Sequence, residues 1–127
     1  MQTAKRILLV DDDTDDQMLF TEALTEIHPF IKCDVANDGV EAINLLSKQP
    51  FYDLIFLDLN MPRMDGFECL QRIKSTNFYK QIPVVILSTS SRKEDSDRSL
   101  HLGASRFFTK PSTYQNLFVQ LKGILSM

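Results

Sequence analysis

The stretch LIFLD, from Leu54 to Asp58, is a run of four large apolar residues that ends in an acid. Three other apolar runs also end in a polar side chain that could contact a phosphate or a metal: ILLV (7–10) before Asp11 and Asp12, VVIL (84–87) before Ser88, and RFFT (106–109) before Lys110. Short runs of this composition are typical of buried parallel strands. Because ligands bind at the carboxyl ends of the strands in an open parallel sheet, we expect these polar side chains to meet at one edge.

Strand-like and helix-like segments alternate along the whole chain, which predicts an α/β fold with a doubly wound parallel sheet. We expect strands near residues 5–10, 31–36, 53–58, 83–88 and 105–109. We expect helices from just after Asp13 to Pro29, then at about 38–48, 66–75 and 92–102, and from 112 to the C-terminus.

The first and fourth predicted helices carry specific expectations. Asp13 is placed to cap the first helix, with Asp16 three residues further on. The segment between Ser88 and Ser99 contains no large apolar residue, so only Leu100 and Leu102 could anchor the fourth helix. Since packing supplies most helical stability, this helix should be loosely held. It is either simply solvated or an element that moves.

Composition indicates one globular domain. The chain has 127 residues, of which 43% are hydrophobic and 24% charged, and its net charge of −3 gives no electrostatic case for binding nucleic acid. No run is long enough to cross a membrane and no signal-peptide pattern is present, so we expect a cytoplasmic protein. Cys33 and Cys69 lack metal-ligand spacing and are expected to be free thiols.

Acidic residues are crowded at the end of the first predicted strand. Five of them fall within six positions: Asp11, Asp12, Asp13, Asp15 and Asp16. Neighbouring carboxylates repel one another, and a bound cation is one physical reason for a chain to tolerate them.

Four motifs together closely resemble the receiver domain of response regulators, the CheY-like module of two-component signalling. They are LLVDDD (8–13), LDLNMPRMDG (57–66), LSTSS (87–91) and FFTKP (107–111). The resemblance implies a flavodoxin-like sheet of order 2-1-3-4-5 with five helices, and a single receiver domain over residues 1–127 with no output domain. The LSTSS stretch also resembles stand-alone receivers that serve bacterial phytochromes.

The same resemblance assigns a phosphoryl acceptor and a metal site. Asp58 would be the acceptor, since a carboxylate can attack phosphorus and form an aspartyl phosphate. Mg²⁺, for which Mn²⁺ would substitute, would be bound directly by Asp12 and Asp58 and by the backbone carbonyl of Asn60, with Asp11 holding a water on the metal. Because three consecutive acids follow the strand, Asp11 and Asp12 are chosen over Asp13, which is better placed as a helix cap.

Further residues take switch roles by resemblance. Lys110 would pair with a phosphoryl oxygen, or with Asp58 at rest, and the Lys110–Pro111 bond resembles the family's cis peptide. Ser88 would donate a hydrogen bond to the phosphate, and Phe107 would turn inward as that hydroxyl moves. Asn60 and Ser90 would tune the rate of dephosphorylation.

We therefore expect a signalling receiver rather than an enzyme, phosphorylated by a sensor histidine kinase or a histidine phosphotransfer protein. A change of its surface at residues 90–125 would reach a downstream protein target, with no nucleic acid or membrane involved. By analogy with related systems, the kinase would dock on the exposed face of the first helix (Thr14, Gln17, Met18 and Thr21). The apolar arc from Tyr114 to Leu125 makes a homodimer possible.

The sequence leaves three alternatives to a phosphorylated receiver open. Asp11-x-Asp13 resembles the nucleophile and acid of haloacid-dehalogenase-type phosphohydrolases, although the expected Thr lies one position early, at Thr14. Asp11, Asp13, Asp15 and Glu22 match four EF-hand positions, but Asp16 stands where the turn needs Gly. A receiver fold without phosphorylation is the third, and the full set of Asp, Ser and Lys argues against it.

Overall fold

The computed structural model of the chain describes residues 5–48 and 51–126. Five parallel strands form one sheet in the order β2-β1-β3-β4-β5, which confirms the predicted α/β fold and its 2-1-3-4-5 order. The strands are β1 (Arg6–Val10), β2 (Lys32–Ala36), β3 (Leu54–Leu57), β4 (Val84–Ser88) and β5 (Arg106–Thr109). The helices are α1 (Thr14–Ile27), α2 (Gly39–Lys48), α3 (Gly66–Lys74), α4 (Lys93–His101) and α5 (Tyr114–Leu125). The last helix begins two residues later than predicted, and Met127 lies outside the described residues.

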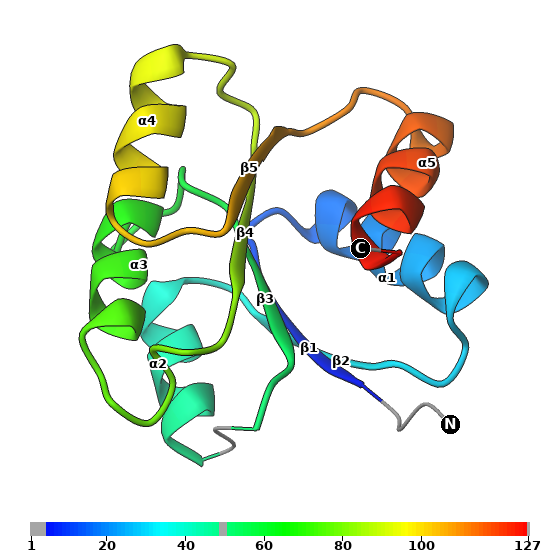
Figure 1. Ribbon diagram of the computed structural model, residues 1–127. Coiled ribbons are helices and arrows are strands. Elements are labelled where there is room, and N and C mark those ends of the chain that lie inside the picture. The colour runs from blue at the N-terminus through cyan, green and yellow to red at the C-terminus, as the bar shows by residue number, and fades with distance from the viewer. Residues whose placement is uncertain (1–4, 49–50, 127) are drawn as a thin grey trace.

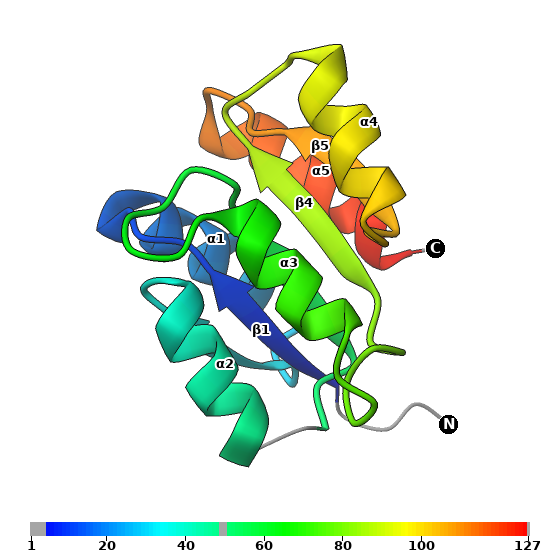
Figure 2. The same ribbon diagram turned by 90° about the vertical axis from the view of Figure 1, so that its left-hand side faces the viewer.

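The sheet is the middle of three layers. Helices α1 and α5 cover one face, and α2, α3 and α4 cover the other (Figure 1); the second group lies in front of the sheet in Figure 2. Side chains of a strand alternate between faces. Leu8 and Val10 therefore join the core under α2 and α3, whereas Ile7 and Leu9 join the core under α1 and α5. Burial on both faces explains why the strands read as continuous apolar runs.

The parallel register brings the carboxyl ends of the strands to one edge. Val10 pairs with Leu57 across β1 and β3, and Ser88 pairs with Thr109 across β4 and β5. The backbone amide of Lys110 donates to the carbonyl of Ser88 at 2.6 Å, which fixes the start of the β5–α5 loop against the end of β4.

Helix α1 begins as predicted, with the Asp13 carboxylate accepting a hydrogen bond from the amide of Asp16 at 2.9 Å. Its inner stripe is buried at Phe20, Ala23 and Leu24. Capping and apolar periodicity thus place this helix, and with it the acidic run, at the carboxyl edge of the sheet.

Helix α4 is held as sparsely as predicted, but only one of its two expected anchors packs against the core. Ser99 is its one buried residue, and Leu100, an expected anchor, is 44% exposed. That expectation was wrong because the helical period turns Leu100 outward, while Leu102, just beyond the helix, packs partly against the core. The guanidinium of Arg98 lies 4.0 Å from the ring centre of Phe67 on α3, a cation–π contact between the two helices.

Helix α5 packs most of its apolar arc inward. Leu117, Leu121 and Ile124 are buried, and Val119 is exposed. The arc that made a dimer conceivable is therefore largely occupied within the chain itself. Across residues 5–48 and 51–126, no helix combines the length and apolar character needed to cross a membrane.

Candidate functional site

Three carboxylates meet at the carboxyl edge of the sheet. Asp11 and Asp58 are only 3% and 6% exposed, whereas Asp12 is exposed. One oxygen from each lies within 4.8 Å of the other two. Ligands of a single Mg²⁺, bound at about 2.1 Å in an octahedron, lie at comparable separations, and an all-oxygen donor set suits Mg²⁺ or Mn²⁺. The donor set therefore fits the predicted cation, while a ligand role for the Asn60 carbonyl stays a prediction.

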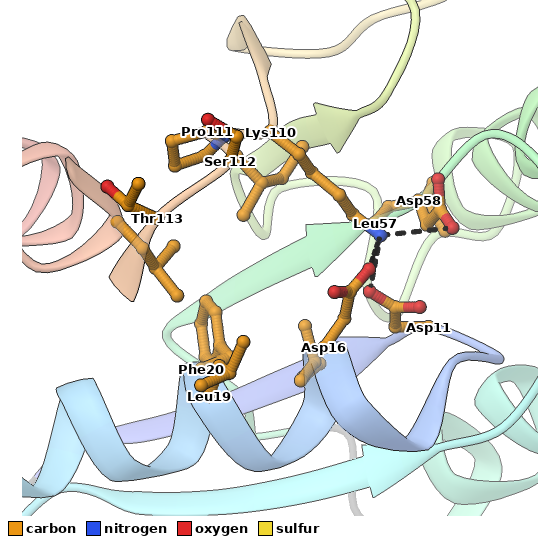
Figure 3. Close-up of a pocket in the computed structure, with 13 residues that line it drawn as sticks. Asp11, Asp16, Leu19, Phe20, Leu57, Asp58, Lys110, Pro111, Ser112 and Thr113 are labelled. Carbon is orange, nitrogen blue, oxygen red and sulfur yellow. Dashed lines mark hydrogen bonds and ion pairs between the residues drawn. The ribbon is translucent and has the colours of Figure 1, made fainter. Parts of the chain in front are cut away.

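Lys110 faces this cluster from the β5–α5 loop. Its ammonium lies 2.8 Å from Asp11, 2.9 Å from Asp16 and 3.4 Å from Asp58 (Figure 3). Burial alone would lower the pKa of Lys110, but the hydrogen bonds to Asp11 and Asp16 outweigh it and raise the pKa above its usual value. Lys110 is thus a fixed positive charge beside the expected acceptor, as predicted.

Asp58 is held at both oxygens. The amide of Asn60 donates to Oδ1 at 3.3 Å, and Lys110 donates to Oδ2 at 3.4 Å. Burial raises the pKa of Asp58 to about 6, with Lys110 opposing that rise and Asp11 adding to it. Burial also raises the pKa of Asp11, against the hydrogen bond from Lys110. A buried, oriented and more basic carboxylate is suited to nucleophilic attack.

Asp16 is a member of the site that sequence reasoning missed. It was expected only to complete the first turn of α1, yet its carboxylate accepts from Lys110. Side chains in a helix tilt toward its N-terminus, so an acid in the first turn can reach back over the strand end. The direction of helical side chains and the excess of acids in this turn were the two sequence features that could have indicated that Asp16 belongs to the site.

The loop after β4 is organised by its hydroxyl groups. Ser88 is fully buried, and its Oγ accepts from the amide of Ser90 at 3.2 Å. The Ser90 hydroxyl donates to Asp95 at 2.6 Å, which ties the loop to the first turn of α4. Asn60 Nδ2 contacts the hydroxyl of Thr89 at 3.4 Å and so joins the loops after β3 and β4. Sequence reasoning missed the contacts of Thr89 and Asp95.

The loop after β3 is tightly fixed to the backbone of the site. A Cβ on Gly66 would lie 2.4 Å from the carbonyl oxygen of Asp58, so only glycine lets α3 begin this close. Arg63, at a positive φ of 65°, forms an ion pair with Asp38, the acid that caps α2. The amide of Glu41, and more weakly Arg63, hold the pKa of Asp38 below its ordinary value. This ion pair forms a clamp between the loop after β3 and the loop before α2, and the sequence did not predict it.

A cavity of about 220 Å³ adjoins the cluster, between α1 and the start of α5 (Figure 3). Apolar side chains line most of its wall, among them Leu19, Phe20 and Leu117. Asp16 and Lys110 lie at its polar end, next to Asp58. The cavity therefore opens onto the charged site rather than forming a separate one.

Two expectations at β5 have different outcomes. No peptide bond in the described part of the chain is cis, so the cis Lys110–Pro111 bond expected by resemblance is wrong in this structure. The trans form is the lower-energy isomer by about 0.5–1 kcal/mol before proline. Phe107 is half-buried and packs against the core under α2 and α3. Its inward turn stays a prediction.

The expected docking face on α1 is only partly free. Met18 is 66% exposed and Thr14 is exposed. Gln17, however, donates to the backbone carbonyl of Asp11 at 2.6 Å, and the Thr21 hydroxyl donates to the carbonyl of Gln17 at 3.0 Å. Gln17 is therefore a structural link between α1 and the site as well as a surface residue.

The geometry also argues against two of the alternatives, the phosphohydrolase and the EF-hand. The Asp13 side chain is engaged as the cap of α1, which removes it as the free acid of a phosphohydrolase. Strand β1 runs directly into Asp11, where an EF-hand needs a helix.

Comparisons with known proteins agree with this geometry. The family model described as "Response regulator receiver domain" matches residues 7–122. Response regulator Rcp1 of Synechocystis sp. is 38% identical, over 96% of this chain and 87% of that protein. The sensor histidine kinase RcsC of Salmonella typhi is 36% identical, over 87% of this chain but 11% of that protein.

Solved structures give the same result. A phosphorylated cyanobacterial phytochrome response regulator, RcpA, superposes with a TM-score of 0.90 at 38% identity, covering 96% of this chain and 91% of that chain. The Mn²⁺-bound form of Rcp1 superposes with a TM-score of 0.87 at 36% identity, covering 97% and 93%. The predicted resemblance to phytochrome-linked receivers is confirmed, and the Mn²⁺-bound relative agrees with the predicted type of cation.

Proposed function

Because the chain belongs to the response-regulator receiver family, we propose that Asp58 accepts a phosphoryl group from a partner histidine kinase or histidine phosphotransfer protein. The observation that carries this proposal is the buried Asp58 carboxylate, held between the Asn60 amide and the Lys110 ammonium beside two further acids. A signalling receiver of this family acts as an acceptor rather than as an enzyme that turns over an external substrate.

The transfer step requires few groups from the chain. An oxygen of Asp58 forms a bond to phosphorus while the phosphorus–nitrogen bond of the donor phosphohistidine breaks. The imidazole leaves with the electron pair and takes up a proton. Lys110 and the Asn60 amide orient Asp58 and offset negative charge, because phosphoryl transfer depends mainly on positioning and electrostatics.

A divalent cation fits the acids Asp11, Asp12 and Asp58, and the chain would hold Mg²⁺ or Mn²⁺ there, with the Asn60 carbonyl as a further ligand. When bound, the cation would offset the negative charge on the oxygens of the transferred phosphoryl group. It would also relieve the repulsion between carboxylates that the buried cluster otherwise carries.

Phosphorylation adds charge and strong acceptors at Asp58. Ser88 would then turn its hydroxyl toward the phosphoryl oxygens. This turn would move the loop after β4, which bonds to Ser88 through the Ser90 amide and to α4 through the Ser90–Asp95 hydrogen bond. Movement of this loop, of the sparsely packed α4 and of Phe107 would change the surface at residues 90–125. A downstream protein would read that surface, and Asn60 and Ser90 would set the lifetime of the phosphoryl group.

The kinase would dock on the exposed part of α1, chiefly Thr14 and Met18. Replacing these two residues with those of another receiver should redirect phosphotransfer between purified kinases. Unchanged kinase preference would exclude this docking face. A homodimer through α5 gains little support, since Leu117, Leu121 and Ile124 of its apolar arc are buried within the chain.

The proposed acceptor is tested by intact mass spectrometry after incubation with acetyl phosphate and Mg²⁺. The wild type should gain one phosphoryl group, and EDTA should abolish the gain. Asp58→Asn should gain none. A phosphoryl gain that persists in Asp58→Asn would contradict the proposal and move the acceptor to Asp11.

A further inference from the structure

Lys110 is shared among three carboxylates, and one of them lies outside the cation cluster. Asp11 and Asp58 belong to that cluster, but Asp16 does not. Asp16 nevertheless lies 2.9 Å from the ammonium, closer than Asp58 at 3.4 Å. Of the three carboxylates that Lys110 contacts (Figure 3), Asp11 is the nearest at 2.8 Å and Asp58, the expected acceptor, is the farthest.

The contact between Asp16 and Lys110 is specific. In the part of the chain that the structure describes, Lys110 is the one side chain that donates to the Asp16 carboxylate. The Lys110 side chain is 12% exposed and that of Asp16 is 38% exposed, so the pair lies at the boundary of the site rather than on the open surface. An ion pair in this setting is screened less than a fully exposed one.

We propose that Asp16 is a positioning residue that holds the Lys110 ammonium toward α1 until a phosphoryl group on Asp58 replaces it. This inference rests on the proposed function of Asp58 as acceptor. Asp16 lies outside the group of carboxylates that fits the cation, and in this proposal it acts through Lys110.

The Asp16 carboxylate and a phosphoryl group on Asp58 would therefore compete for the Lys110 ammonium. A shift of the Lys110 ammonium from Asp16 toward phosphoryl oxygens on Asp58 would weaken the Asp16 pair, and the cost of weakening it is subtracted from the affinity for the phosphoryl group. Because Asp16 lies in the first turn of α1, any partner that moves this turn would also change how readily Lys110 is released.

Beryllofluoride, a tetrahedral mimic of an aspartyl phosphate, tests this at a fixed Mg²⁺ concentration, with binding followed by ¹⁹F NMR. Asp16→Asn should bind beryllofluoride roughly three- to tenfold more tightly than the wild type, since no pair has to be weakened. Asp15→Asn is the matched control. It makes the same change of charge at the preceding position of the same helical turn, and Asp15 is exposed. Its affinity should stay within about twofold of the wild type.

A second readout reports on the lysine itself. In the protein without beryllofluoride, the ammonium protons of Lys110 should exchange with water faster in Asp16→Asn and at the wild-type rate in Asp15→Asn. Asp16→Glu keeps a carboxylate on this turn and should restore much of the protection. A purely structural role for Asp16 would not produce this pattern.

The outcomes separate the two proposals. If the wild type binds beryllofluoride but Asp16→Asn and Asp15→Asn behave alike in both readouts, the positioning role is overturned and the acceptor role stands. If the wild type binds no beryllofluoride, the proposed function fails, and this inference fails with it.

Discussion

At the scale of single residues, two acids of the site, Asp11 and Asp58, are buried where their negative charge is unfavourable. Asp58 ends a strand that is buried on both faces, and burial raises its pKa to about 6. The position of Asp58 at the sheet edge was predictable from the sequence, because an acid directly after a buried parallel strand must lie at that edge. The contact between Asp16 and Lys110 was not, since it depends on where a loop ninety-four positions away delivers a long side chain.

The raised pKa predicts that Asp58→Asn stabilises the metal-free protein at neutral pH. The folded pKa of about 6 lies above the unfolded value of about 3.9. Ionised Asp58 therefore costs stability above pH 6, and the cost is relieved as the pH falls toward 4. We expect a gain in the free energy of unfolding on the order of 2 kcal/mol at pH 7.5, measured by urea denaturation in EDTA.

That gain should shrink at pH 5, and the control Asp15→Asn should show little change at either pH. A gain that did not depend on pH, or a loss of stability at pH 7.5, would contradict a desolvated carboxylate at this position.

Gly66 gives a second prediction at the residue scale. In Gly66→Ala, the new Cβ would meet the backbone of Asp58 and Leu59 at 2.4 Å, so α3 must shift. We expect a loss of about 3 kcal/mol in urea denaturation. Gly123→Ala is the control, because nothing lies within 4 Å of its Cβ position, and it should stabilise α5 by up to about 1 kcal/mol. Equal changes in the free energy of unfolding for the two substitutions would contradict a close contact between the start of α3 and the backbone of Asp58.

At the scale of elements, sequence periodicity located all ten helices and strands in the described residues to within about two positions. It also indicated correctly that α4 is poorly anchored. It was right about Leu102, which packs partly against the core, and wrong about Leu100, which is exposed. It missed the polar groups that also hold α4: Arg98 over Phe67, the buried Ser99, and the Ser90–Asp95 contact. Pairings between polar groups of different elements leave no periodic signal in a sequence.

Sparse anchoring predicts rapid hydrogen exchange in α4. Amides of α4 should exchange faster than those of α5, which buries three apolar residues, when both are followed by mass spectrometry. Arg98→Ala should accelerate exchange in α4 and leave α5 unchanged. Lys93→Ala, which removes only an exposed pair with Asp97, should have little effect. Equal protection of α4 and α5 would contradict a mobile α4.

At the scale of the whole molecule, parallel topology is what turns four separate motifs into one site. The order 2-1-3-4-5 places β1 between β2 and β3, so the acids after β1 lie beside Asp58, and Lys110 reaches them from beyond β4. The sequence predicted this convergence from the shared edge of parallel strand ends, and the resemblance to receivers agreed with it. It did not predict the clamp between Arg63 and Asp38 or the trans Lys110–Pro111 bond, because each depends on loop conformations that local sequence leaves open.

Chemical trapping would show whether Asp58 itself carries the phosphoryl group. Borohydride reduces an aspartyl phosphate to homoserine, so the protein would be phosphorylated with acetyl phosphate and Mg²⁺, reduced, digested and sequenced by mass spectrometry. We expect homoserine at position 58, and only in the phosphorylated sample. Homoserine at position 11 with an unmodified Asp58 would contradict this expectation.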